Sequence, residues 1–234
     1  MPRTGESGTV SPGGPPPAGA PALSAEGVRL ADEAGRSHGP LDMVVRPGEM
    51  SLVIVRELGL LRRLMKCCLA FERPDSGRLS WWPGAVPGDA FYRQIGYVDR
   101  QSQLLHRWSL LDHFRIFDGY SGAAGDPGAA RKLLDSLGLT AQAGLPTENL
   151  AEPVRRLALY ALALYQRPRL MLLERPFQSL DRDFQLVWDL IRGRVAAGEL
   201  AVMVFERSRD PYPQDSFRQT AVFSHSSAGP LNLS

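Results

Sequence analysis

Two adjacent arginines, Arg62 and Arg63, stand near the start of an apolar helical stretch that follows a strand-like run. Two guanidinium groups beside the first turn of a helix could attract an anion, because backbone N–H groups there lack intrahelical partners. The alternative is that both point to solvent or pair with nearby acids such as Glu57. The sequence holds only two lysines, Lys66 and Lys132, so a phosphate-binding lysine has two candidates.

Other residues with chemical potential are scattered along the chain. Cys67 and Cys68 are adjacent within the apolar helical stretch, so we expect buried reduced thiols rather than a disulfide. Asp181 and Asp183 favour a helix N-cap with an acid in the first turn over a metal site. The sequence shows no cluster of His and Cys with metal-ligand spacing and no nucleophile–base pair. We therefore expect no metal and no cofactor.

The apolar pattern predicts an α/β protein. Continuous runs rich in β-branched residues, such as 50–55, indicate strands that are covered on both faces, as in a parallel sheet. Helical spacing of apolar residues recurs between the strands. Strands are predicted at 28–30, 41–45, 50–55, 78–82, 95–98, 170–173, 200–205 and 220–223, and helices at 60–71, 109–117, 129–137, 153–165 and 184–196.

Length and composition bound the class of protein. The 234 residues suit one α/β domain or one domain in two lobes, and 44% of them are apolar. No stretch reaches the roughly 18–20 apolar residues of a membrane-spanning helix. The net charge of +2 comes without a basic stripe, so we expect no nucleic acid as partner. Residues 1–22 are rich in Pro and Gly and are predicted to be a disordered tail without the apolar core of a signal peptide, followed by one domain over 23–234.

Five short segments together resemble the ATP-binding-cassette (ABC) ATPases, in that family's order. They are Arg-Pro-Gly-Glu at 46–49, Glu-Arg-Pro-Asp-Ser-Gly-Arg-Leu at 72–79, Ile-Gly-Tyr-Val at 95–98, the run 167–177 ending in Leu-Leu-Glu-Arg-Pro-Phe, and Ser179-Leu180-Asp181, which matches the family's D-loop. The resemblance implies a two-lobed fold with a mainly parallel core sheet, flanking helices and a helical subdomain at about 101–166.

The same resemblance assigns ATP-handling positions to residues of other types. In the phosphate loop, Leu60 stands for a glycine, Leu61 for the lysine and Arg62 for the Mg²⁺-binding hydroxyl. Further along the chain, Arg100 stands for the Q-loop glutamine, Ala151, Glu152 and Pro153 for the Ser-Gly-Gly of the signature, Glu174 for the Mg²⁺-binding aspartate, Arg175 for the catalytic glutamate, and Glu206 for the switch histidine.

These replacements predict a chain without catalysis. A guanidinium does not act as a base in proteins, so Arg175 cannot replace a catalytic glutamate, and a pair with Glu206 or Asp181 is the expected role. Pro153 has no N–H to donate to a phosphate, and Glu152 adds a repelling charge. Glu152 and Pro153 together make a favourable helix start instead. The sequence therefore predicts a pseudo-ATPase that is not an enzyme.

The resemblance also implies partners and a location. We expect a structural or regulatory subunit of an ABC-type transport complex, under membrane-spanning subunits and paired with an ATPase subunit, either an active homologue or its own copy. Such a protein would be cytoplasmic and peripheral on the inner face of the cytoplasmic membrane, and analogy suggests lipid or lipoprotein as cargo. Candidate contacts with the membrane subunits are Gln101, Gln103, Leu104 and Trp108, and packing inside the helical lobe is their alternative.

Two other functions stay open at this point. The fold could be reused as a soluble scaffold or regulatory binding module without any link to transport. The chain could also be a weak, atypical ATPase that works through Arg62, Arg63 and Glu174.

Overall fold

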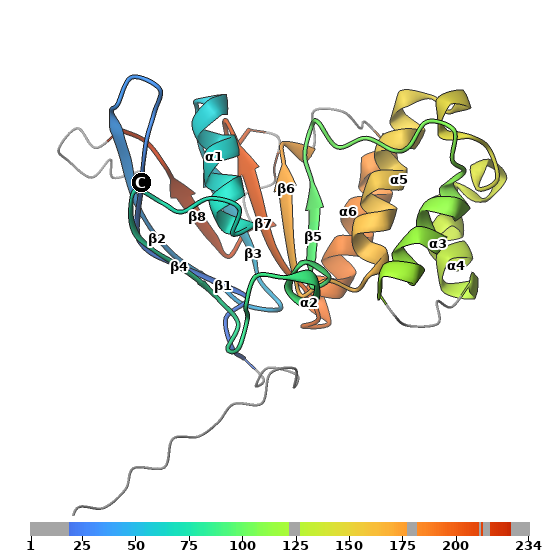
Figure 1. Ribbon diagram of the computed structural model, residues 1–234, viewed down its shortest axis with the longest axis horizontal. Helices are drawn as coiled ribbons and strands as arrows, with labels where there is room; N and C mark the ends of the chain where they lie inside the picture. The colour runs from blue at the N-terminus through green and yellow to red at the C-terminus, as the bar shows by residue number, and fades with distance from the viewer. Residues whose placement is uncertain (1–18, 122–126, 177–181, 211, 213–215, 226–234) are drawn as a thin grey trace, which may run out of the picture.

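The computed structural model describes residues 19–121, 127–176, 182–210, 212 and 216–225. A five-stranded parallel sheet with the order β5-β6-β7-β3-β8 forms its centre, and a three-stranded antiparallel sheet with the order β2-β1-β4 lies beside it. Helix α1 stands between the two sheets, and α5 and α6 cover the opposite face of the central sheet (Figure 1). The strands are β1 (Leu23–Ala31), β2 (Ser37–Val45), β3 (Met50–Ile54), β4 (Ser76–Trp81), β5 (Ile95–Val98), β6 (Leu170–Glu174), β7 (Ala201–Glu206) and β8 (Gln219–Val222).

The helices fall into two groups. Helix α1 (Leu58–Cys68) and the short α2 (Asp89–Tyr92) belong to the side of the antiparallel sheet. Helices α3 (Leu110–Ser121), α4 (Pro127–Ser136), α5 (Glu152–Tyr165) and α6 (Arg182–Ala196) lie on the other side, together with the 3-10 turns η1 (Thr140–Gln142) and η2 (Thr147–Asn149). Cys67 and Cys68 are buried free thiols in α1, as predicted, and burial raises the pKa of Cys67 to about 11.

The central strands are apolar along their whole length because both of their faces are covered. Every residue of β6 and β7 is buried, and these two strands lie in register from Leu170 beside Ala201 to Glu174 beside Phe205. Parallel strands buried on both faces show such unbroken apolar runs. The two faces of the sheet accordingly belong to two hydrophobic cores, one shared with α1 and the antiparallel sheet and one shared with α3 to α6.

The structure corrects three expectations about elements. Strand β1 begins at Leu23 rather than Val28, because its first residues pair with both β2 and β4. Ala22, assigned to the disordered tail, is fully buried, and its N–H donates to the carbonyl of Val45. The predicted helix 60–71 ends at Cys68, where the chain turns through Ala70 with a positive φ of 59°. The D-loop Ser179-Leu180-Asp181 and most of the predicted tail lie outside the described residues.

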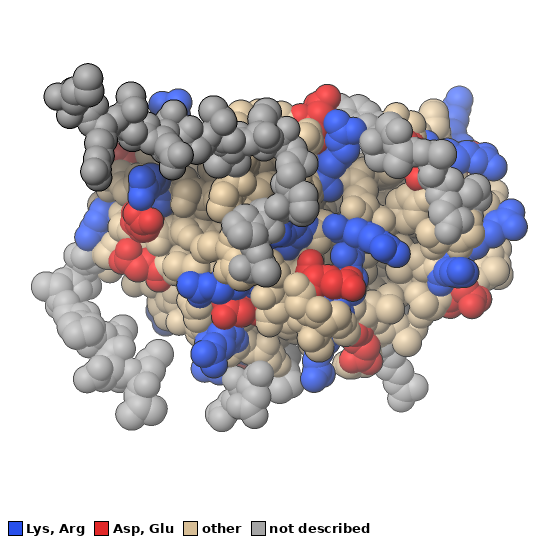
Figure 2. Space-filling view, turned by 90° about the horizontal axis from the view of Figure 1, so that it is seen from below, with Lys and Arg blue, Asp and Glu red and all other residues tan. Residues whose placement is uncertain are grey.

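Charges of both signs are spread over the surface. The face in Figure 2 shows Lys and Arg side chains interspersed with Asp and Glu over largely uncharged surface. In the described part of the chain, no helix is long and apolar enough to cross a membrane.

Candidate functional site

Two buried carboxylates meet at the carboxyl ends of the central strands. Glu174 ends β6 and Glu206 ends β7, and each is only 1% exposed. The two strands are neighbours, with Glu174 beside Phe205 in the register. Because adjacent parallel strands end at the same edge of a sheet, two positions far apart in the sequence share one site.

Two arginines face these carboxylates. The Nε atom of Arg62, from α1, lies 4.0 Å from Oε1 of Glu174, and Nε of Arg175 lies 3.9 Å from Oε2 of Glu206. The backbone N–H of Arg100 donates to Oε2 of Glu174 over 3.4 Å. The structure thus brings together five positions that the resemblance had singled out, and the predicted pair of Arg175 with Glu206 is present.

The backbone of Arg175 is strained. Its φ of 46° lies in the left-handed region, where a residue with a Cβ costs of order 1–3 kcal/mol. The N–H of Arg175 donates to the carbonyl of Phe205 over 2.9 Å, which ties the end of β6 to β7. The strain therefore sits at the point where the guanidinium is directed toward Glu206.

Burial and hydrogen bonds act in opposite directions on the pKa of Glu206. Burial raises its pKa, and hydrogen bonds from the Arg207 N–H and the Tyr212 hydroxyl act in the opposite direction. The Tyr212 hydroxyl donates to Oε1 over 3.2 Å, and the Arg207 N–H to Oε2 over 3.2 Å. Burial and the neighbouring carboxylate raise the pKa of Tyr212, so this hydroxyl remains a donor.

Replacing Tyr212 with phenylalanine tests this arrangement. We expect Tyr212→Phe to lower the free energy of unfolding by about 1.5–3 kcal/mol at neutral pH, since a buried charged acceptor loses its donor. The loss raises the pKa of Glu206 further above its ordinary value of 4.5. When the pKa of a carboxyl group is raised in the folded state, the protein loses stability as the pH rises above the unfolded-state pKa. The difference in unfolding free energy between Tyr212→Phe and the native chain should therefore grow between pH about 4.5 and about 7.5. Urea unfolding at both pH values measures it, and an equal deficit at both would contradict the assignment.

The positions assigned to the phosphate loop are part of the core. Leu60 is 4% exposed and Leu61 is fully buried, both packed in the core that α1 shares with the antiparallel sheet. Helix α1 begins directly after Glu57, which is the N-cap residue without a side-chain hydrogen bond. Apolar side chains at i and i+4 share a face of a helix, and Leu60, Leu61 and Leu64 use that face to hold α1 between the sheets.

The two arginines of this helix pair with acids, as one of the alternatives proposed. Arg63 makes two contacts with Asp75, at 2.7 and 2.9 Å, and donates to the carbonyl of Ala31. Arg62 lies toward Glu174 instead. Glu57, the acid suggested for them, is 3.4 Å from Arg36.

The signature positions form the start of α5. Ala151 is the N-cap residue, Glu152 and Pro153 lie in the first turn, and Glu152 pairs with Arg155 at 2.8 Å. This is the favourable helix start that the sequence predicted. One turn later, the buried Arg156 donates to the main-chain carbonyl of Asp99, so α5 is tied to the segment that follows β5.

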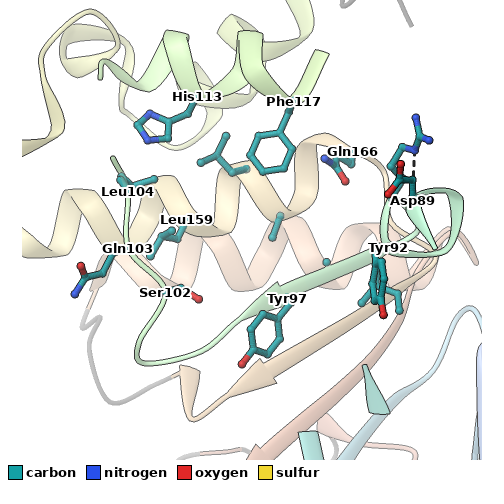
Figure 3. Close-up of a pocket in the computed structure, with 15 residues that line it drawn as sticks. Asp89, Tyr92, Tyr97, Ser102, Gln103, Leu104, His113, Phe117, Leu159 and Gln166 are labelled. Atoms are coloured by element: carbon teal, nitrogen blue, oxygen red, sulfur yellow. Dashed lines mark hydrogen bonds between the residues drawn. The ribbon is translucent and has the colours of Figure 1, made fainter. Parts of the chain in front are cut away.

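A groove runs beside the edge strand β5, between α2 and helices α3 and α5 (Figure 3). It encloses about 440 Å³. Tyr97, Phe117 and Leu159 supply apolar walls, and Ser102, Gln103 and Gln166 supply polar groups. These walls are not visible in the sequence, because α3 and α5 also fill a core and their apolar pattern does not separate core-facing from groove-facing positions.

Two of the four residues predicted to contact the membrane subunits line the groove. Gln103 and Leu104 line it, and Gln101 and Trp108 do not. Leu104 is 5% exposed and belongs mainly to the core. Trp108 is 45% exposed, so it does not pack inside the helical lobe. The exposed Leu105 lies beside it, and its carbonyl accepts a hydrogen bond from the backbone N–H of Trp108.

Similarity to known proteins supports the resemblance in part. The Fe(3+) ions import ATP-binding protein FbpC of Pseudomonas fluorescens is 35% identical over 132 residues, which cover 50% of this chain and 35% of that protein. The Nod factor export ATP-binding protein I of Cupriavidus metallidurans is 26% identical over 168 residues, or 70% of this chain and 55% of that protein. The chain thus spans about a third to a half of these relatives. No model of a known protein family matches it.

These relatives correct one prediction from the sequence. The replaced motif residues predicted a pseudo-ATPase that is not an enzyme, whereas the relatives carry the names of ATP-binding proteins. The prediction of no activity is therefore wrong as a conclusion from these residues.

Solved structures with the same arrangement establish the fold. An ATP-binding subunit of an ABC transporter superposes with a TM-score of 0.75 at 16% identity, over 87% of this chain and 86% of that one. The ADP conformation of an ATP-binding cassette of an ABC transporter gives a TM-score of 0.66 over 88% of each chain, also at 16% identity. The central parallel sheet, its flanking helices and the antiparallel sheet of this chain form the ABC ATPase fold.

Proposed function

We propose that this chain is a subunit of an ABC-type membrane transport complex and that it binds the membrane-spanning subunits through the groove beside β5. The groove is the observation that carries this proposal. It combines apolar walls with polar groups at its mouth, as sites for a partner's helix or loop do. It also lies at the contact of α5 with β5, so a segment bound there would touch both the central sheet and the helical side of the molecule.

The names of the relatives support this role. They describe import of Fe(3+) ions and export of Nod factor, both by ATP-binding proteins. We therefore propose ATP as the nucleotide of the complex, with a second ATP-binding subunit, either a homologue or a second copy of this chain, as partner. The complex would place the chain at the inner face of the cytoplasmic membrane. Lipid or lipoprotein cargo stays a prediction from analogy, since the two relatives are named for other cargoes.

Affinity purification from detergent-solubilised native membranes tests the proposal. The tagged full-length chain should bring down membrane-spanning subunits and a second ATP-binding subunit, identified by mass spectrometry. We expect Gln103→Trp to reduce recovery of the membrane subunits at least about tenfold, because Gln103 is exposed at the groove and the larger side chain blocks it.

Gln101→Trp is the matched control, because Gln101 is exposed two residues away and does not line the groove. It should leave recovery and the melting temperature unchanged. Equal loss with both variants would contradict the groove as the contact. Recovery of the chain alone from the soluble fraction would replace the transport role with that of a soluble scaffold.

A further inference from the structure

Three side chains with metal-binding atoms meet where the β1–β2 hairpin approaches the first turn of α1. They are Asp32, His38 and Glu57, and one ligand atom of each lies within 4.8 Å of those of the other two. Asp32 and His38 come from the hairpin and Glu57 is the N-cap residue of α1. The site is separate from the carboxylates of β6 and β7 and from the groove beside β5.

The carboxylate of Asp32 is held in place by the hairpin. Its Oδ1 accepts hydrogen bonds from the backbone N–H groups of Ala34, at 2.9 Å, and of Arg36, at 2.8 Å. Its Oδ2 faces Nε2 of His38 at 3.0 Å. Backbone donors on one oxygen leave the other oriented for a ligand, which is the way outer contacts orient carboxylates at metal sites.

His38 is oriented as firmly as Asp32. It is 4% exposed, and the ring of His225 packs against it with 5.7 Å between centroids. Its Nδ1 is buried and has no hydrogen-bond partner. The separation of 3.0 Å between Nε2 and Oδ2 is close to the ~3.3 Å expected for two ligands of one tetrahedral ion with bonds of about 2.0 Å.

Arg36 currently supplies the positive charge between the two carboxylates. Its Nε lies 2.7 Å from Oδ2 of Asp32 and its Nη2 lies 3.4 Å from Oε1 of Glu57. The Arg36 side chain is 56% exposed and that of Glu57 is 46% exposed. The Arg36–Glu57 pair is therefore exposed on both sides and contributes little to stability, whereas the Asp32 side chain is only 5% exposed, so a cation that replaces the guanidinium must take over its charge there.

We propose that Asp32, His38 and Glu57 bind a divalent transition metal ion of the Zn²⁺ type, which takes the place of the Arg36 guanidinium. The ligands would be Oδ2 of Asp32, Nε2 of His38 and the carboxylate of Glu57, with water in the fourth position. One imidazole nitrogen and two carboxylates suit Zn²⁺ among the common metals. With Nε2 bound to the ion, the ring proton of His38 lies on Nδ1.

The surroundings give the ion access and a structural role. A pocket of about 400 Å³, lined by Asp32, Arg36, Glu57 and the first turn of α1, opens beside the ligands. A bound ion would join the antiparallel sheet to the N-terminus of α1, and it would add to stability according to its concentration and affinity.

Calorimetric titration of the full-length chain with ZnCl₂ tests the site, with no histidine tag and after treatment with a chelator. We expect one equivalent of Zn²⁺ to bind. Glu57→Gln and His38→Ala should each weaken binding at least about tenfold, the lower range for loss of a supporting group at metal sites. Arg36→Ala should strengthen binding, because it removes the competing cation. Glu33→Gln, an acid of the same pocket outside the triad, should bind as the native chain does.

Cobalt provides a second readout that does not depend on the buried His38 variant being folded. Co²⁺ in the native chain should show the intense visible absorption of a tetrahedral ion, and Glu57→Gln should lose it. The absence of Zn²⁺ binding in both the native chain and Arg36→Ala would overturn the proposal. Binding that Glu57→Gln leaves unchanged, or that Glu33→Gln weakens equally, would overturn it as well.

Discussion

Replacing Gly77 with alanine should lower the free energy of unfolding by at least about 3 kcal/mol. Gly77 lies in β4 with a φ of 78°, in the left-handed region. A Cβ atom there would lie 2.3 Å from the carbonyl oxygen of Gly27 and 2.4 Å from its carbonyl carbon, on the neighbouring strand β1. Both are backbone atoms, so relief requires β1 and β4 to separate. Left-handed strain of about 1–3 kcal/mol and a similar cost of overpacking add together.

Gly27→Ala is the matched control for this prediction. Gly27 also has a positive φ, of 57°, and its added Cβ would meet no atom within 4 Å. We expect a loss of about 1–2 kcal/mol, the cost of the left-handed backbone alone. Urea unfolding of both variants measures the difference. If the two losses are equal, the close approach of β1 and β4 at Gly77 is not what requires glycine there.

Restoring a lysine at position 61 should destabilise the protein by about 3 kcal/mol or more. The resemblance assigns Leu61 to the lysine of the phosphate loop, yet its side chain is fully buried in the core around α1. Leu61→Lys would either bury an ammonium group or push the first turn of α1 away from the sheets. A buried charge without a partner is among the costliest changes in a core.

Arg62→Lys provides the comparison for Leu61→Lys. Arg62 is the next residue, its side chain is 37% exposed, and lysine keeps the positive charge that faces Glu174. We expect a change of no more than about 1 kcal/mol. Thermal or urea unfolding of the two variants decides the matter. Native-like stability of Leu61→Lys would show that position 61 can leave the core, as a phosphate-binding residue would have to.

Local patterns were sufficient to predict most of the fold. Parallel strands covered on both faces consist of apolar residues throughout, so β6 and β7 are visible in the sequence within one residue of their ends. The helix start at Glu152 and Pro153 follows from the chemistry of single residues. Strand β1 was harder, because its first residues become a strand only through pairing with β2 and β4.

Local patterns predicted less about the sites. Glu174, Arg175 and Glu206 were singled out by the family resemblance, which left Glu206 and Asp181 as alternative partners of Arg175, and the structure shows the pair with Glu206. The partners of Arg62 and Arg63 were left open, since a sequence does not show which acid on another element lies within reach. In the structure, Glu174 at the end of β6 lies nearest Arg62, and Asp75 in the segment before β4 pairs with Arg63.

The sequence alone was enough to predict the ABC ATPase fold, because the apolar pattern indicates an α/β protein and five short segments resemble that family. Only the tertiary structure decided which polar groups meet. Asp32 and His38 lie on either side of a hairpin turn and Glu57 follows one further strand, β3, so no spacing signals their approach within 4.8 Å. Contacts between elements depend on how those elements pack, and packing is a property of the whole chain rather than of any segment.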